Sequence, residues 1–302
     1  MCIQDSVAPF ESIETLTAAM ADRGYFAGHS LAAAIFLSVN MSKPLLLEGE
    51  PGVGKTEVAK VLASLVGAPL IRLQCYEGID VHQAIYQWDF ARQMIHIRML
   101  QSEHGIRDIS RVIYGEEFLL KGPLLRALES TAEAPAVLLI DEIDRADDEF
   151  EALLLEALSD YQVSVPEIGT VSAAFPPIVV ITSNRTREVH DALKRRCLYQ
   201  WIDFPSAAAE QRIVMAKVPD ASQLLVMKVT RFVQELRAVD LYKVPGIAET
   251  IDWARALVYL GCEDLTREAV LDSIGALLKY QEDMKWSRSK DFAQLMDLVT
   301  DA

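Results

Sequence analysis

The sequence predicts an α/β fold in which helices cover both faces of a parallel sheet, followed by an all-helical domain. Up to Pro205, short and strongly apolar runs alternate with segments of helical periodicity. One of the apolar runs leads straight into a glycine-rich loop and then into a helix. Beyond Pro205 the helical patterns continue without any strand pattern. We therefore expect two domains, residues 1–205 and 206–302.

Continuous apolar runs predict strands that are buried on both faces, as in parallel sheets. These runs are Pro44–Leu47, Leu70–Gln74, Ala136–Asp141, Ile178–Thr182 and Leu198–Asp203. Apolar residues at helical spacing predict the helices between them, over residues 13–21, 30–39, 57–66, 124–130 and 149–158. Alternating polarity predicts a strand over Gln93–Met99 and a small hairpin from Tyr161–Val165 to a partner beyond Gly169. Gly105 to Gly115 is predicted to be a loop.

The part after Pro205 is predicted to be helical throughout. Helical periodicity is seen over residues 207–216, 222–239, 247–260, 267–280 and 287–298. About a hundred residues is a common size for a domain.

A phosphate-binding pattern, G-x-x-x-x-G-K-[ST], is formed by Gly49, Glu50, Pro51, Gly52, Val53, Gly54, Lys55 and Thr56. An apolar strand precedes it and an amphipathic helix follows, which is the context that the pattern requires. The glycines allow backbone N–H groups to surround phosphates, and the helix N-terminus adds positive potential. We expect Lys55 to reach the terminal phosphates of a nucleotide and the Thr56 hydroxyl to ligate Mg²⁺.

Two carboxylates follow the most apolar strand. Asp141 and Glu142 end the run Leu138-Leu139-Ile140, at the edge of the sheet where open α/β folds bind ligands. We expect Asp141 to hold Mg²⁺, through water, and Glu142 to orient or deprotonate an attacking water. The acids that follow, Asp144, Asp147 and Asp148, are interpreted as part of a solvated loop.

Two further polar features lie near the last strands. Asn184 follows the strand Ile178–Thr182, where its amide can hold the attacking water, contact a γ-phosphate or merely cap a turn. Arg195 and Arg196 stand just before the final strand. They form either a surface patch or a group that reaches a neighbouring subunit's nucleotide, where such an arginine increases the rate about 10³–10⁵-fold.

Composition makes several classes of protein less favoured. The formal net charge of −15 disfavours a non-specific nucleic-acid motor. Cys2, Cys75, Cys197 and Cys262 form no C-x-x-C pair and are expected to be reduced, mostly buried thiols of a cytoplasmic protein. The five histidines show no metal-ligand spacing, and neither a signal peptide nor a membrane-spanning run is expected.

The phosphate loop, acidic strand, asparagine and paired arginines, in this order, resemble the AAA+ ATPase superfamily and its MoxR branch. Gly122–Leu125, Leu139–Ala146 and Ala152–Leu158 carry the likeness to MoxR proteins. Other segments are similar to the CoxD-like subgroup, the ATPases of carbon monoxide dehydrogenase maturation. These segments are residues 47–57, 71–78, 182–188, 195–199 and 245–257, and those around Cys75 and Cys197 are the most specific.

The resemblance implies a set of roles and partners. It implies ATP and Mg²⁺ as cofactors, Asn184 as the sensor residue, and Arg196, or Arg195 in its place, as an arginine finger acting across a subunit boundary. It also implies a homo-oligomer in the form of a hexameric ring, a partner with a von Willebrand factor A domain and a client metalloenzyme whose copper–sulfur–molybdenum centre is completed after folding. Where MoxR relatives carry a second sensor arginine, this chain has Gly246-Ile247-Ala248-Glu249, and Arg255 lies further along the helix.

Two other functions are compatible with the phosphate loop. A nucleic-acid motor or loader would require a basic pore, and stimulation of ATP hydrolysis by DNA would support it. A kinase or nucleotide switch requires neither Asn184 nor the paired arginines, and phosphate transfer to an acceptor would support it.

Overall fold

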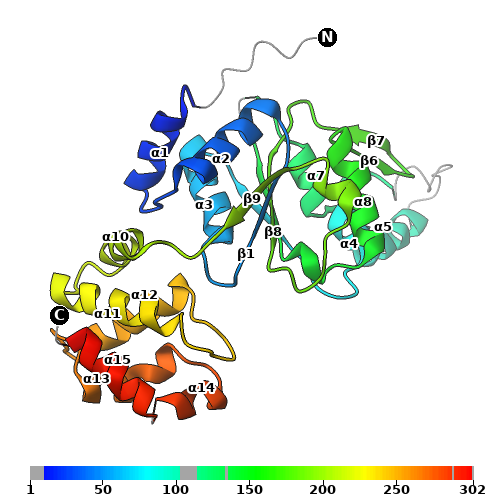
Figure 1. Cartoon of the computed structure of the whole chain (residues 1–302). Helices are drawn as coiled ribbons and strands as arrows, with labels where there is room; N and C mark the ends of the chain where they lie inside the picture. Colours follow the sequence, from blue (N-terminus) through cyan, green and yellow to red (C-terminus); the bar gives the residue numbers. More distant parts are fainter. Residues whose placement is uncertain (1–9, 103–113, 133–134, 288, 301–302) are drawn as a thin grey trace. The chain divides into compact units, whose positions relative to one another are not determined.

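The computed structural model describes residues 10–102, 114–132, 135–287 and 289–300. The part of the chain before α10, Ala207–Lys217, contains a five-stranded sheet in the order β2-β5-β8-β1-β9 (Figure 1). The strands are β1 Leu45–Gly49, β2 Leu70–Gln74, β5 Val137–Asp141, β8 Ile178–Ser183 and β9 Leu198–Ile202. The pairs β1–β8, β8–β5 and β5–β2 are all parallel, so the α/β class predicted from the sequence is confirmed.

Helices cover both faces of this sheet, as Figure 1 shows for α2 and α3 on one side and α7 and α8 on the other. Their bounds are α2 His29–Met41, α3 Lys55–Val66, α7 Pro123–Leu128 and α8 Asp148–Ser159. Alternate residues of one strand face opposite layers, so that Leu138 and Ile140 join the core with Phe150 and Leu154 of α8. Every residue of β1 and β5 is buried, which is why both strands are recognisable as unbroken apolar runs.

Several further elements before α10 are short. They are α1 Ile13–Asp22, α4 Val81–Ile85, η1 Glu116–Phe118, η2 Ile143–Arg145, α9 Asp191–Lys194 and the antiparallel hairpin of β6 Gln162–Val165 and β7 Gly169–Ser172. The hairpin confirms the prediction for residues 161–172.

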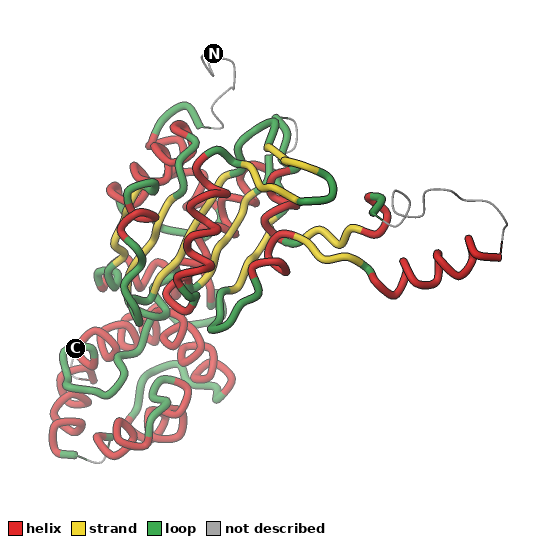
Figure 2. The backbone as a smooth tube through the Cα atoms, turned by 90° about the vertical axis from the view of Figure 1, so that its right-hand side faces the viewer, coloured by secondary structure: helices red, strands yellow, loops and turns green. Residues whose placement is uncertain are grey.

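The predicted strand over Gln93–Met99 is wrong, because these residues are helical. They belong to α5, Phe90–Ser102, whose first turn is capped by Asp89, which accepts a hydrogen bond from the N–H of Arg92. Figure 2 shows α5 projecting from the sheet domain on the antiparallel pair β3 Tyr86–Trp88 and β4 Leu119–Lys121. Met94, Ile95 and Met99 are each more than half exposed there. Because this helix buries little of its surface, its apolar residues do not follow helical periodicity. Residues 105–113 of the predicted loop lie outside the described residues.

Among the described residues after β9, all the regular elements are helices, which are joined by loops and turns. Its elements are α10 Ala207–Lys217, α11 Gln223–Leu236, α12 Ile247–Tyr259, α13 Arg267–Ser273, η3 Ile274–Ala276, α14 Gln281–Trp286 and α15 Lys290–Thr300. Ser206, Ser222 and Thr266 accept hydrogen bonds from the first turns of α10, α11 and α13, which is why those helices begin where they do. Trp253, Phe232 and Phe292 form the centre of the core.

Two predicted helices in this part differ from the structure. The helix predicted over residues 267–280 ends at Ser273 and continues only as a short 3₁₀ turn containing Gly275, a poor residue for a helix. The helix predicted over 287–298 begins at Lys290, because the Ser289 side chain accepts a hydrogen bond from the N–H of Phe292. The short helix α14 has no counterpart among the sequence predictions.

Contacts divide the chain into two compact units. One comprises the chain up to Leu16, His29–Glu48 and Val58–Gln200, and the other comprises Thr17–Gly28, Gly49–Glu57 and the chain from Trp201 onward. The phosphate loop is thus grouped with the helical part. In the described part of the chain, no helix has the length and apolar character needed to cross a membrane.

Candidate nucleotide site

The phosphate loop connects the end of β1 with the start of α3. Gly52 and Gly54 have φ values of +81° and +95°, which side-chain-bearing residues rarely adopt, so the loop depends on glycine at both positions. The buried Lys55 ammonium donates to the carbonyl oxygens of Gly49 at 2.7 Å and of Glu50 at 2.8 Å. These bonds hold a cation against the loop, at the N-terminus of α3, where an anionic phosphate is favoured.

The first turn of α12 packs directly on this loop. The N–H of Ile247 donates to the Gly52 carbonyl at 3.1 Å. A Cβ placed on Gly246 would lie 2.8 Å from the Gly52 Cα and 2.8 Å from the Pro51 oxygen, so only glycine permits this approach. Glu249, three residues into the turn, accepts from the Gly246 N–H at 3.0 Å. The Gly246–Glu249 segment, which departs from the MoxR pattern in sequence, therefore contacts the loop through its backbone.

Asp141, at the end of β5, is buried and hydrogen-bonded on both oxygens. Its Oδ1 accepts from the Thr182 hydroxyl at 2.6 Å, and its Oδ2 accepts from the Arg72 guanidinium at 2.5 Å and 3.1 Å. Arg72 lies on β2, the strand next to β5. Sequence reasoning missed Arg72 and Thr182, because their relation to Asp141 exists only once the three strands lie side by side.

Glu142 has a left-handed backbone with φ of +58°, unusual for a residue other than glycine. Its N–H donates to the Thr182 hydroxyl at 2.9 Å, which fixes this conformation. Its carboxylate accepts from the Gln74 amide at 3.0 Å and lies 3.2 Å from the Arg145 Nε. Non-glycine residues in such a conformation cost about 1–3 kcal/mol and concentrate at functional sites.

Asn184 lies close to Glu142. Its Nδ2 is 3.5 Å from the Glu142 Oε1, although the two residues follow different strands, β8 and β5. The structure therefore brings Asn184, for which a role in holding the attacking water was one of the alternatives, close to Glu142. Gln74 joins them from β2, opposite Asp141 in the sheet register. The sequence feature that could have identified Gln74 is a polar residue at the end of an apolar strand.

The arginines named in the sequence analysis follow α9 or lie within α12. Arg195 is the first residue after α9. Both Arg195 and Arg196 are exposed, and Arg196 donates to the Ala192 carbonyl at 3.3 Å. Arg255 is also exposed, and its guanidinium contacts the Lys217 carbonyl at 3.4 Å and Asp252 at 3.6 Å.

The cysteines in the described part of the chain are free thiols, with Cys75 buried and Cys197 and Cys262 half-buried. Burial, together with the negative charges of Asp141, Asp144 and Glu142, raises the pKa of Cys75 to about 12. Burial likewise raises the pKa of Cys197 to about 12. Both thiols therefore stay protonated at neutral pH and are unsuited to act as nucleophiles or metal ligands.

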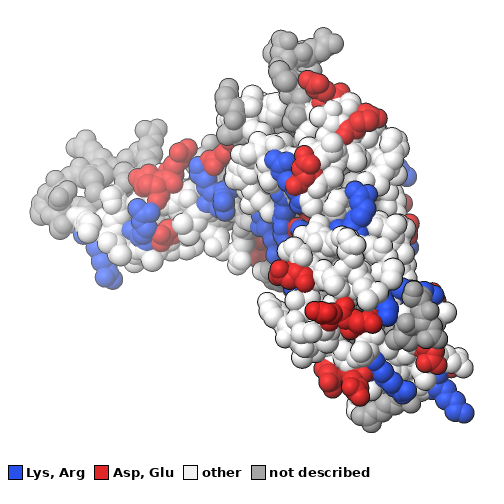
Figure 3. Space-filling model, turned by 90° about the vertical axis from the view of Figure 1, so that its left-hand side faces the viewer, with Lys and Arg blue, Asp and Glu red and all other residues white. Residues whose placement is uncertain are grey.

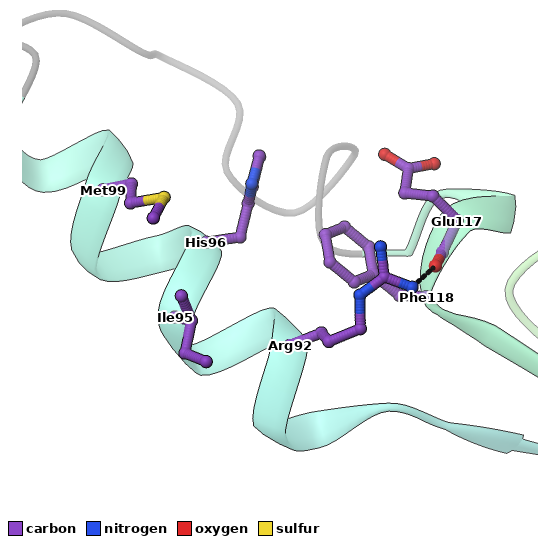
Figure 4. A pocket seen from close by; sticks show the side chains of 6 residues that line it. All are labelled: Arg92, Ile95, His96, Met99, Glu117 and Phe118. Atoms are coloured by element: carbon purple, nitrogen blue, oxygen red, sulfur yellow. Dashed lines mark hydrogen bonds between the residues drawn. The ribbon is translucent and has the colours of Figure 1, made fainter.

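A separate hollow of about 270 Å³ lies on the projecting arm, between α5 and η1 (Figure 4). Ile95, His96 and Met99 line it on one side and Phe118 on the other. Arg92 closes one end by donating to the Glu117 carbonyl at 3.0 Å. None of the residues predicted to bind nucleotide lines this hollow.

The chemistry of these residues suits a nucleotide and a magnesium ion. The loop offers a cation, backbone N–H groups and a helix N-terminus, which suit a phosphate chain. Asp141 and Thr56 offer hard oxygen donors, the kind that Mg²⁺ prefers.

Comparisons with known proteins bear on the family. The chain is 24% identical over 230 residues to an uncharacterised protein of Staphylococcus saprophyticus, covering 74% of this chain and 78% of that protein. It is 25% identical over 237 residues to an uncharacterised protein of Staphylococcus haemolyticus, covering 76% and 80% respectively. Among solved structures, a point mutant of Thermotoga maritima RuvB aligns with a TM-score of 0.49 at 16% identity, covering 91% of this chain and 75% of that one.

The family itself is shown by a direct match to its sequence model. The model of the AAA domain, dynein-related subfamily, matches residues 44–197, slightly more than half of the chain. The matched range contains the phosphate loop, both carboxylates and Asn184, and most of the strands of the parallel sheet described above. The chain therefore belongs to the AAA domain family, in its dynein-related subfamily.

Proposed function

We propose that the protein hydrolyses ATP with Mg²⁺ and uses this energy to remodel a client protein. In this proposal the loop Gly49–Thr56 binds the phosphates, with Lys55 neutralising their charge, and Thr56 and Asp141 hold the magnesium ion. The ion supplies charge neutralisation and orientation of the phosphates when it is bound. The membership of the AAA family supports nucleotide binding in general.

The observation that carries the proposal is the convergence of Glu142, Asn184 and Gln74 from three adjacent strands. A general base must lie within hydrogen-bonding reach of the water that it activates. The Glu142 carboxylate is held by the Gln74 amide at 3.0 Å and lies 3.5 Å from the Asn184 amide. Glu142 then accepts the proton of the attacking water, while the Asn184 amide orients that water.

The ATPase is proposed to act as a homo-oligomer, in the form of a hexameric ring. Arg196, or Arg195 in its place, is exposed at the end of α9 and is available to a neighbouring subunit. A guanidinium from outside stabilises charge that develops on the transferred phosphoryl group. The site would then reach full activity only in the assembled protein.

The finer role that we propose is that of a MoxR-type, CoxD-like chaperone in the cytoplasm. Its partner would be a protein with a von Willebrand factor A domain, and its client a metalloenzyme such as a molybdenum hydroxylase with a copper–sulfur–molybdenum centre. The residues around Cys75 and Cys197 support the subgroup, as given above. A protein client is favoured over nucleic acid by the net charge of −15 and by the mixing of acidic and basic side chains on the face drawn in Figure 3.

The first test replaces the lysine of the loop. Lys55→Ala should weaken ATP binding by at least about tenfold, because the buried ammonium that balances the phosphate charge is lost. Binding is measured with a fluorescent ATP analogue, and Lys60→Ala, an exposed lysine on the same helix, is the control. Equal affinity in the two variants would refute the assignment of the loop.

The second test separates binding from hydrolysis. Glu142→Gln should bind ATP as the wild type does but hydrolyse it about 10²–10⁴-fold more slowly, since general-base catalysis contributes about that much. Glu149→Gln, an exposed acid in the same region, is the control. Unchanged turnover in Glu142→Gln would place the base elsewhere. Stimulation of turnover by DNA, or transfer of phosphate to an acceptor instead of water, would favour the other two functions.

A further inference from the structure

The segment that follows β8 is anchored by two buried carboxylates. This segment, residues 184–190, begins with Asn184 and leads into α9, which ends at Lys194. The anchors are Asp144, in η2, and Glu151, in α8, which are 3% and 1% exposed. The interpretation of Asp144 as part of a solvated loop is therefore wrong. Carboxylates are rarely buried to this extent unless they are fully hydrogen-bonded.

Asp144 binds the beginning of the segment. Its Oδ1 accepts from the Asn184 N–H at 3.2 Å, and its Oδ2 accepts from the Thr186 N–H at 2.9 Å and the Thr186 hydroxyl at 2.6 Å. Burial alone would raise the pKa of Asp144, but these hydrogen bonds bring its pKa below the ordinary value. Arg185, between the two bonded residues, has a left-handed backbone with φ of +57°. Such a conformation persists only when the surroundings hold it in place.

Glu151 binds the end of the segment. It accepts from the His190 N–H at 2.8 Å and pairs with the Arg187 guanidinium, which also donates to the Ala146 carbonyl at 2.7 Å. Both ends of the segment are thus attached to the chain that runs from Glu142 through η2 into α8. Displacement of the Asn184 backbone relative to η2 would lengthen its hydrogen bond to Asp144.

We propose that Asp144 is a positioning residue, which fixes the backbone of Asn184 and thereby sets the position of the Asn184 amide relative to Glu142. This inference rests on the proposed function of Glu142 and Asn184. Asp144 acts through Asn184 and does not touch the substrate. Its carboxylate accepts three hydrogen bonds, and an asparagine in its place would turn an NH₂ group toward N–H donors.

The position of the segment is tested first, by hydrogen exchange at backbone amides. Asp144→Asn should increase exchange at the Asn184 and Thr186 amides about 10- to 100-fold, since hydrogen bonds to charged groups are among the stronger ones. Exchange at the His190 amide, which is bound by Glu151, should change by less than about twofold. Asp148→Asn is the control. The Asp148 side chain is exposed, and within the segment 184–190 it pairs with Arg187 through Nη1, whereas Glu151 pairs with Nη2. Unchanged exchange at Asn184 and Thr186 would overturn the inference.

The effect on catalysis is tested by a double-mutant cycle. Asp144→Asn should lower kcat about 10- to 100-fold with little change in KM, because it disturbs the reacting water and not the binding of ATP. In the presence of Asn184→Ala, the same substitution should lower kcat by less than about twofold further. A structural role unconnected with Asn184 would lower kcat by the same factor in both backgrounds, and this result would also overturn the inference.

Two controls keep the outcomes distinct. If Asp144→Asn does not fold, Thr186→Val is used, which removes the hydroxyl that donates to Asp144. This variant should also increase amide exchange and lower kcat. A lack of effect would overturn the inference. If the wild-type protein does not hydrolyse ATP, the proposed function is overturned. The exchange measurement still decides in that case whether Asp144 holds the Asn184 backbone.

Discussion

The contact between Gly246 and the phosphate loop leads to a quantitative prediction for Gly246→Ala. In the structure the added Cβ would lie 2.8 Å from the Gly52 Cα and 2.8 Å from the Pro51 oxygen. Favourable contacts between such atoms lie at about 3.5–4.0 Å, so the two backbones must separate by roughly 1 Å. The neighbours are backbone atoms of a tight loop, and no flexible side chain is available to move away.

The cost has two parts. Overpacking of this kind costs about 1–3 kcal/mol. Separation also breaks the bond from the Ile247 N–H to the Gly52 carbonyl, at 3.1 Å, which is worth about 1 kcal/mol. We expect the free energy of unfolding to fall by about 2–4 kcal/mol, and ATP affinity to fall about tenfold, because the loop that binds the phosphates is displaced.

The assay is urea unfolding followed by fluorescence and circular dichroism, together with ATP titration. Gly275→Ala is the control, because no atom lies within 4 Å of its added Cβ, and its stability should change by less than about 0.5 kcal/mol. If Gly246→Ala is as stable as Gly275→Ala and binds ATP equally well, the close contact between the helix and the loop does not exist in solution.

Three further predictions concern the oligomer, the helical core and pH. Arg196→Ala should leave ATP binding intact but reduce turnover about 10³-fold in the assembled protein, and equal turnover by a dilute monomer and the assembly would contradict this. Arg237→Leu should lower the free energy of unfolding, measured by urea titration, by about 3–5 kcal/mol. Arg237 forms two hydrogen bonds of 2.7 Å with the fully buried Glu210, and its removal leaves that charge unpaired. A loss below about 1 kcal/mol would show that the other hydrogen-bond partners of Glu210 are sufficient. Burial raises the pKa of Cys75 to about 12 and also raises the pKa of Tyr161. The folded protein therefore holds these protons more tightly, and the stability they contribute is complete below the ordinary thiol pKa of 9.0 and declines at higher pH. Melting temperatures measured from about pH 8 to 11 should fall, less steeply for Tyr161→Phe, and a flat profile would be inconsistent with these shifts.

The strands β1, β5 and β8 could be predicted from the sequence because burial on both faces leaves little choice of residue. The predicted strand Pro44–Leu47 corresponds to β1, which begins one residue later and ends two residues later. The predicted strand Leu70–Gln74 has the bounds of β2, although only alternate residues of β2 are buried. The failure at α5 has the opposite cause. Its side chains are largely exposed on an arm, so no buried face imposed a period of 3.6 residues on its apolar positions.

The sequence by itself determined the phosphate loop and the acidic end of β5, because each depends on residues that are neighbours in the chain. The loop requires glycines that adopt positive φ and a lysine to bind phosphate. The end of β5 requires two carboxylates directly after an apolar strand. Only the tertiary structure decided which side chains surround these groups. Arg72 meets Asp141 across 69 positions of the chain, and Asp144 meets Thr186 across 42. Such meetings depend on the order of the strands, β2-β5-β8, and this order arises from the packing of the whole sheet. The residues next to Asp144 in the sequence therefore do not reveal whether its carboxylate is exposed to solvent or bonded to the Asn184 backbone.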